Sequence, residues 1–228
     1  VCSSDLRARI RDRAGKLLGE GRAAGSNLEL GIPHAHANVL AAIASARLAA
    51  GLGIVAVWLT VRQNPWCWPI GLIMVLLYAW FFFDARLYSA VLLHGVFAAM
   101  QLYGWWQWRQ GVDDSGQRPV STAGRNEVLI GLGVALLLGL ALGLAMARLT
   151  EAVYPWPDAL LTAFSLLAQL WMALKRWQCW LLWIVVDVLY VGFFAFQEYW
   201  LTAGLYGVFT ALAVLGLREW RASRTAHA

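Results

Sequence analysis

The stretch that decides the fold is WCWPIGLIMVLLYAWFFFDARLYSAVLLHGVFAAMQLYGWWQW, residues 66–108, because the chain contains it twice. When it is shifted by 112 positions onto residues 178–220, 13 of the 43 pairs are identical, and Trp68 falls on Trp180. Both copies are strongly apolar and long enough to cross a bilayer. Duplicated membrane units that face each other across a pseudo-axis are common in transporters, which hold the substrate between the copies. The duplication therefore favours a small-molecule transporter over an enzyme.

The composition indicates an integral membrane protein. The chain of 228 residues is 61% hydrophobic and only 14% charged, whereas soluble domains carry about 25% charged residues. A helix needs about 20 apolar residues to cross the hydrocarbon core of a bilayer. Seven segments approach that length: residues 39–59, 66–83, 87–108, 128–147, 159–174, 177–196 and 199–217. The predicted fold class is therefore all-α, with seven transmembrane helices.

The repeat also predicts how the seven spans are arranged. Three spans form each unit and the fourth span links them, so the two odd-numbered units keep the same orientation and are related by an axis along the membrane normal. The predicted segments are a first repeat at 39–108, a loop at 109–126, a linker helix at 127–147, a second repeat at 157–221 and a tail at 222–228. Residues 1–38 form a polar segment outside this plan. We interpret it either as an amphipathic surface helix or as a fragment or the product of a mis-assigned start.

The basic residues predict the orientation in the membrane. Cytoplasmic loops collect Lys and Arg, and the connections on one side hold only Arg86 and Arg148. The first 22 residues, which are also basic, disagree with the rest. We predict a cytoplasmic C-terminus, and the net charge of +5 does not indicate a nucleic-acid partner. The basic residues on the C-terminal side are Arg62, Arg109, Arg118, Arg125, Lys175, Arg176, Arg218, Arg221 and Arg224.

One predicted span carries two tryptophans and an acid on one face. At about 100° per residue, Trp180, Trp183 and Asp187 fall within roughly 60° of one another. A carboxylate in the middle of a span costs about 2.5–3.5 kcal/mol to insert, so it must be protonated, paired or in contact with a wet cavity. We interpret the stripe as an anchor for a cationic or hydrogen-bonding substrate, with the indoles stacking on an aromatic ring. The alternative is that the acid pairs with another helix and the indoles only fill space.

Other polar groups within the spans extend this candidate site. His94 and Gln101 share one face of the third span, although a lone buried histidine is often a satisfied core residue. Gln169 lies on one face with Ser165, and its alternative role is a hydrogen bond between helices. Together these groups suit a flat aromatic ring that bears a positive charge and an attached polar group. The candidate substrate-binding residues are Trp180, Trp183, Asp187, Gln169, Gln101, His94, Tyr190 and Trp68.

Enzymatic and metal-dependent functions lack the residues they need. The spans contain no HxxxH pair, no paired carboxylates and no Ser–His pair at helical spacing. Cys67 and Cys179 have no His or acidic partners at ligand spacing, so we expect neither a metal nor a cofactor. A binding subunit that depends on a motor partner is disfavoured, because a duplicated unit can rock by itself.

Four motifs carry a resemblance to a known family. They are WPIG at 68–71, DARLY at 84–88, LYGWWQW at 102–108, and WLLWIVVD at 180–187, which matches a W-x-x-W-x-x-x-N/D pattern. In these motifs, residues 40–221 resemble the Pnu-type vitamin transporters, or PnuC proteins, which carry nicotinamide riboside. The resemblance implies a 3+1+3 fold similar to the SWEET sugar transporters, and a homotrimer in the inner (cytoplasmic) membrane. It also implies facilitated diffusion of this NAD precursor, trapped afterwards by a cytosolic kinase that need not bind the carrier.

Three positions differ from the riboside pattern that the resemblance leads us to expect. Asp187 stands where many riboside carriers have Asn, His94 where we expect Gln, and Gln101 where we expect Asn. The pyridinium of nicotinamide riboside and the thiazolium of thiamine both suit Asp187, whereas neutral riboflavin suits it least. We therefore predict a nicotinamide riboside uniporter, with a thiamine carrier on the same scaffold as the alternative.

Overall fold

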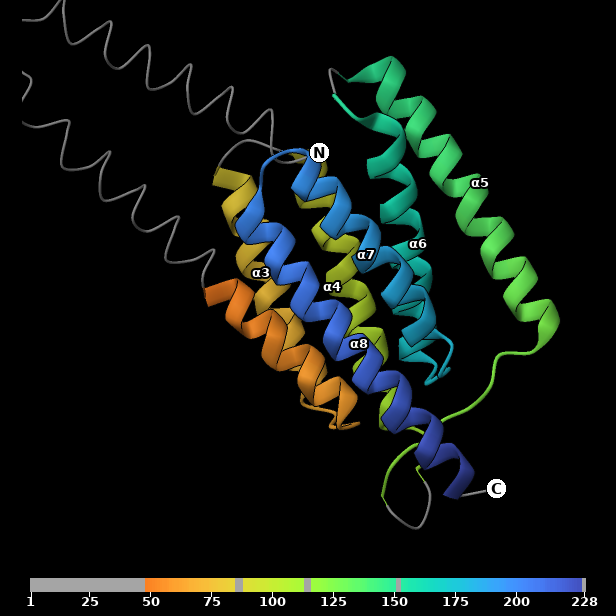
Figure 1. Cartoon of the computed structure of the whole chain (residues 1–228). Helices are drawn as coiled ribbons and strands as arrows, with labels where there is room; N and C mark the ends of the chain where they lie inside the picture. Colours follow the sequence, from red (N-terminus) through yellow and green to blue (C-terminus); the bar gives the residue numbers. More distant parts are fainter. Residues whose placement is uncertain (1–47, 85–87, 113–115, 151–152, 227–228) are drawn as a thin grey trace, which may run out of the picture.

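Seven α-helices make up the part of the chain that the computed structural model describes, which is residues 48–84, 88–112, 116–150 and 153–226 (Figure 1). The first is the helix Leu48–Val61. The polar segment predicted at residues 1–38 and the start of the first span lie outside the described residues. The other helices are α3 (Cys67–Asp84), α4 (Tyr88–Trp108), α5 (Arg125–Leu149), α6 (Pro155–Ala173), α7 (Cys179–Phe196) and α8 (Trp200–Ala226).

The ends of these helices follow the predicted spans, with two clear differences, at α6 and α8. α6 begins at Pro155, four residues before the predicted start at residue 159. α4 ends at the predicted Trp108, and its predicted start at residue 87 lies outside the described residues. α8, in contrast, continues to Ala226, nine residues beyond the predicted end at residue 217. The tail predicted at residues 222–228 is therefore helical as far as Ala226. Hydropathy marks where the apolar stretch stops, whereas the Ala- and Arg-rich sequence after it still favours helix.

Three of the described helices are long and apolar enough to cross a membrane by length and composition. They are α5, α7 and the part of α8 from Trp200 to Arg224. The stretches Leu48–Val61 and Cys67–Trp80 are shorter apolar helices. α4 and α6 contain 21 and 19 residues, which at about 1.5 Å per residue is close to the thickness of the hydrocarbon core. The chain is a helical protein that passes through the membrane several times.

The two repeats pack in the same way. α3 packs on α4 and α7 packs on α8, while α6 contacts α4, α5 and α7. α3 and α7 run in the same direction, and so do α4 and α8 (Figure 1). α5 lies at the edge of the bundle against α6. The second helix thus packs on the third in both repeats.

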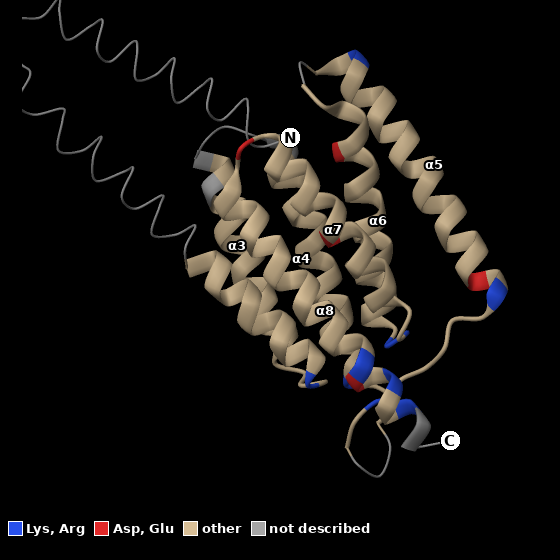
Figure 2. Cartoon of the chain, in the orientation of Figure 1, with Lys and Arg blue, Asp and Glu red and all other residues tan. Residues whose placement is uncertain are grey.

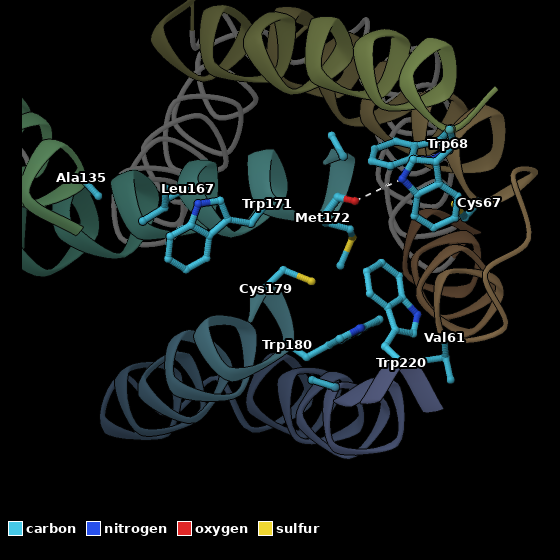
Figure 3. Packing of buried hydrophobic residues seen from close by; sticks show 13 residues of the cluster. Val61, Cys67, Trp68, Ala135, Leu167, Trp171, Met172, Cys179, Trp180 and Trp220 are labelled. Atoms are coloured by element: carbon cyan, nitrogen blue, oxygen red, sulfur yellow. Dashed lines mark hydrogen bonds between the residues drawn. The ribbon is translucent and has the colours of Figure 1, made fainter. Parts of the chain in front are cut away.

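The buried cluster in Figure 3 contains one pair of indoles from each repeat, and the two pairs have the same geometry. Trp68 meets Trp108 edge to face, with ring centroids 5.4 Å apart and planes at 85°. Trp180 meets Trp220 at 5.4 Å and 89°. Edge-to-face contacts place the positive edge of one ring on the negative face of the other. Each repeat therefore joins its second helix to its third through the same aromatic contact.

Two glycines make room for these indoles. A Cβ atom at Gly104 would overlap the indole of Trp68, and a Cβ atom at Gly216 would overlap that of Trp180. The two glycines are 112 positions apart, as are the two tryptophans. Close approach of the ring to the backbone is therefore required twice, and only glycine permits it.

Hydrogen bonds cross between the repeats at the same end of the bundle. The indole Nε1 of Trp108 donates to the carbonyl oxygen of Met172 at 3.1 Å, as Figure 3 shows, and that of Trp220 donates to the carbonyl oxygen of Thr60 at 3.1 Å. Thr60 and Met172 are again 112 positions apart. The last helix of each repeat is thus held by the first helix of the other.

The connection predicted as a loop at residues 109–126 is fastened to the turn between α6 and α7. Ser121 accepts a backbone hydrogen bond from Trp177 at 3.1 Å and donates one to Lys175 at 2.9 Å. Farther along, Arg176 Nε lies 3.0 Å from Glu127 Oε1 at the start of α5. These contacts tie the linker helix to the second repeat at the end of the molecule where α8 ends.

The basic residues of the described chain gather at that same end (Figure 2). They occupy the turns after the helix Leu48–Val61 and after α6, the connection before α5, and the last turns of α8. Arg148 lies at the opposite end, near the end of α5. We call the end with the basic residues the basic end.

Candidate functional site

Buried polar groups lie between α6 and α7. Ser165 and Gln169 are buried on α6, and Asp187, which is 4% exposed, is buried about halfway along α7. Because water is absent from the bilayer core, polar groups at this depth need partners inside the protein or in a ligand.

Tyrosines from two helices complete a cluster around the acid. The ring centroids of Tyr190 on α7 and Tyr206 on α8 are 4.6 Å apart. Both hydroxyls lie within electrostatic range of Asp187, and that of Tyr190 also interacts with Ser165 and Thr162. We call these five residues the acid cluster. It presents a carboxylate and several hydroxyls to one place between α6, α7 and α8.

Trp183 adds a hydrogen-bond donor one turn away from Asp187. Its side chain is half-buried and packs against the hydrophobic cluster. Its Nε1 is buried and finds no acceptor among the described residues. A buried donor without a partner costs about 1–3 kcal/mol, so this N–H is suited to an acceptor supplied by a ligand. The structure thus brings three predicted residues, Trp183, Asp187 and Tyr190, to one stretch of α7.

Trp68 and Trp180 lie elsewhere. They are 2% and 1% exposed and belong to the indole pairs near the basic end. Asp187 is seven residues farther along α7 than Trp180, which is about 10 Å at about 1.5 Å per residue. The structure therefore does not bring these two indoles to the acid cluster, and their contact with a substrate remains a prediction.

His94 and Gln101 come from α4. The Nδ1 of His94 is 2.8 Å from the carbonyl oxygen of Ala90 and must donate, which leaves Nε2 as an acceptor. Its ring lies 5.8 Å from that of Tyr78. The amide of Gln101 lies over Gly71, where a Cβ atom would come within 2.8 Å of Nε2. His94 therefore belongs to an aromatic group of α3 and α4, and Gln101 depends on the absence of a side chain at Gly71.

The polar groups do not follow the repeat, although the packing does. The positions of the first repeat that correspond to Asp187, Trp183, Gln169 and Ser165 are Val75, Gly71, Val57 and Gly53. Conversely, the positions that correspond to Gln101 and His94 are Ala213 and Tyr206. A site between the repeats would receive its acid and hydroxyls from one unit and an amide and an imidazole from the other. Such asymmetry suits a ligand with chemically different ends.

Thr162 of the acid cluster was not among the residues predicted from the sequence. It lies three residues before Ser165 and seven before Gln169, a spacing that keeps all three on one face of a helix. The signal was therefore present in the sequence. A threonine hydroxyl usually bonds the carbonyl one turn back, which makes such a residue easy to set aside.

Comparison with known proteins assigns the family. Residues 44–222 match the model of the family described as nicotinamide mononucleotide transporter. The riboflavin/roseoflavin transporter RibM of Streptomyces davaonensis is 27% identical over 175 residues, which cover 74% of this chain and 80% of that protein. The nicotinamide riboside transporter PnuC of Escherichia coli is 30% identical over 175 residues, covering 66% of this chain and 73% of that protein.

A solved structure has the same fold. The crystal structure of the vitamin B3 transporter PnuC matches with a TM-score of 0.67 at 22% identity, covering 81% of this chain and 83% of that one. At this level of identity the likeness establishes the fold alone. Together with the family match over most of the sequence, the bundle described above shows that the chain belongs to the nicotinamide mononucleotide transporter family of multi-pass membrane proteins.

Proposed function

We propose that the chain carries nicotinamide riboside across the membrane by facilitated diffusion. The observation that supports this most directly is the acid cluster next to the indole N–H of Trp183, which has no acceptor among the described residues. A carboxylate at this depth is stabilised by a cation, and the pyridinium ring of the riboside is a flat cation that an indole face can also hold. Gln169 and Gln101 offer amides for the carboxamide and ribose groups.

Riboflavin is the second candidate because of the relationship to RibM. That relative is aligned over larger shares of both chains than the nicotinamide riboside transporter of Escherichia coli. Riboflavin is neutral, so it would leave Asp187 without a counter-charge and would have to use it as a hydrogen-bond acceptor. Thiamine, which carries a thiazolium, remains the other cation that suits the acid cluster.

The arrangement of the repeats supports a rocking mechanism. We infer two parallel three-helix units joined by α5, as in the SWEET sugar transporters. The second and third helices of each unit pack on each other, and α3 runs in the same direction as α7, as α4 does with α8. The basic end then faces the cytoplasm, since cytoplasmic loops collect Lys and Arg. A homotrimer in the inner membrane, and a cytosolic kinase that traps the product without necessarily binding the carrier, complete the proposal.

Titration of the purified full chain with the three vitamins tests the substrate. We expect heat of binding with nicotinamide riboside, and at least tenfold weaker binding of riboflavin, equivalent to about 1.4 kcal/mol. In proteoliposomes without any ion gradient, preloaded riboside should exchange for labelled riboside. The reason is that Asp187 is the sole acid of α7 and of the acid cluster, so the cluster has no second carboxylate that could carry a coupled proton. Tighter binding of riboflavin, or exchange that requires an imposed proton or sodium gradient, would contradict the proposal.

Replacing Trp183 with Phe should weaken riboside binding by about 0.5–1.5 kcal/mol, the contribution of one hydrogen bond. The substitution keeps an aromatic face and removes only the N–H that has no acceptor among the described residues. Isothermal titration of the parent and the variant measures the difference.

Trp180→Phe is the matched control. It makes the same chemical change on the same helix, and the Nε1 of Trp180 is also buried without a partner among the described residues. Because Trp180 packs on Gly216 near the basic end, its variant should keep the parent's affinity within about twofold, or about 0.4 kcal/mol. Equal losses in the two variants would place the substrate against both indoles, as the helix-face spacing predicts.

A further inference from the structure

Lys175 is a buried cation at the basic end. It is 1% exposed, and it lies in the turn between α6 and α7. Its Nζ donates to Gln63 Oε1 at 2.9 Å and to the carbonyl oxygen of Arg118 at 2.8 Å. Gln63 lies in the turn between the helix Leu48–Val61 and α3. The ammonium group thus joins the second repeat to the first and to the connection before α5.

The two residues that meet are equivalents of each other. Gln63 and Lys175 are 112 positions apart, the offset of the repeat. Each follows the end of a helix in the left-handed conformation, with φ of 56° and 54°. The backbone N–H of Gln63 bonds the carbonyl of Thr60, and that of Lys175 bonds the carbonyl of Met172. Equivalent residues can touch only at the axis that relates the repeats, so this contact lies on it.

The backbone at these positions normally carries glycine. Helices that end with one left-handed residue use glycine there most often, because a side chain is strained in that conformation. Here both repeats keep a long side chain instead. Both turns therefore contain a strained residue. The side chains of these two residues make the contact on the axis that is described above.

Indoles of both repeats enclose the ammonium. Lys175 Nζ lies 4.6 Å from the ring centroid of Trp108 and 6.0 Å from that of Trp220. Both distances fall within the range in which a cation is attracted by a ring face. These are the same indoles that donate hydrogen bonds across the repeats. A further bond, from Gln63 Nε2 to Ser223 Oγ at 3.0 Å, adds α8 to the group.

We propose that Lys175 and Gln63, between Trp108 and Trp220, form an axial latch that closes the transport path at the basic end and opens to let the substrate leave there. The proposal rests on the transport function proposed above. Rocking of two units about their common axis must separate the residues that bridge them at the open end. A buried ammonium group is suited to this role, because its hydration on opening offsets the contacts that it loses.

A pair of spin labels across the basic end tests the latch without any ligand. Gln110 and Ala222 are both exposed and are 112 positions apart. Gln110 lies just beyond the end of α4, and Ala222 lies in the last turns of α8. Both are replaced by Cys in a full-length chain carrying Cys2→Ser, while the native Cys67 and Cys179 are buried. Double electron–electron resonance in lipid nanodiscs then measures the distance between the labels.

Lys175→Met should increase the population with the long label distance, relative to the population with the short one, by about tenfold or more. The reason is that two charge-assisted hydrogen bonds are lost. Gln63→Lys should have the same effect through repulsion of two ammonium groups on the axis. The exchange Gln63→Lys/Lys175→Gln should return most of the short distance, since the site is nearly symmetric. Two bonds are not recreated: the one to the carbonyl of Arg118 and the one from Gln63 Nε2 to Ser223 Oγ.

The outcomes separate the latch from other roles. A purely structural lysine would lower the melting temperature of Lys175→Met while leaving the label distances unchanged, and that result would overturn the proposal. So would a double exchange that opens as far as either single variant. If Lys175→Met fails to fold, Gln63→Leu keeps the lysine but removes its acceptor and the bond to Ser223, and it must still lengthen the distance. Because no vitamin is added, a wrong substrate assignment leaves all of these readings unaffected.

Discussion

Asp187→Asn should reduce the affinity for thiamine by about 2–3 kcal/mol, and the affinity for nicotinamide riboside by less than about 1.4 kcal/mol, or tenfold. The substitution preserves the shape and one acceptor but removes the charge from the centre of the acid cluster. A riboside carrier should tolerate this change, because the motif that the chain resembles admits Asn at this position. A carrier that holds a thiazolium or an aminopyrimidine through the carboxylate should not.

The measurement is isothermal titration of both vitamins against the parent and the variant. Asp158→Asn is the control, because it makes the same chemical change in the first turn of α6, within electrostatic range of Tyr190 but outside the acid cluster. Its affinities should stay within about twofold of the parent, or about 0.4 kcal/mol. If Asp187→Asn leaves the binding of every vitamin unchanged, Asp187 is a structural residue and its electrostatic role in the proposed function is wrong.

The helices could be predicted from the sequence because each apolar span of one repeat has an equivalent span in the other. A span that is ambiguous in one copy is supported by its equivalent in the other, and α4 ends at the predicted Trp108. The end of α8 was missed by nine residues, because hydropathy reports the thickness of the bilayer and not the end of a helix. Arg221 and Arg224 lie in this extension, where their guanidinium groups lie over Trp177 at 5.0 and 5.6 Å.

The candidate site shows what helix spacing can predict and what it cannot. Spacing along a helix gives the direction of a side chain around the axis, so it places Trp183 and Asp187 on one face of α7. The same rule grouped Trp180 with them, because it ignores position along the axis, where Trp180 meets Trp220 instead.

Lys175 shows a second limit. Its neighbours in the sequence mark a polar turn, and its burial arises only where residues 112 positions apart meet. No local pattern carries that information, because the partner of Lys175 lies in the other repeat. The sequence predicts that the basic residues gather at one end of the molecule, as they do. It does not predict that one of them, Lys175, is buried.

Trp108→Ala and Trp220→Ala should each lower the free energy of unfolding by about 3–5 kcal/mol, the usual range for removing a buried aromatic side chain. Trp220 is completely buried and Trp108 is 2% exposed. Each indole also donates a hydrogen bond to a carbonyl of the other repeat, which would lose its partner. Thermal unfolding of the variants in one detergent measures the loss against the parent.

The comparison between these two variants is more informative than either value. If the repeats share one packing scheme, equivalent substitutions should cost the same to within about 1 kcal/mol, the scatter expected from differences in how well each cavity collapses. Trp106→Ala, two residues before Trp108 and 58% exposed, should change stability by less than about 0.5 kcal/mol. A large loss at Trp220 with none at Trp108 would show that the second repeat alone carries the core. The equivalence on which the parallel arrangement and the axial latch depend would then fail.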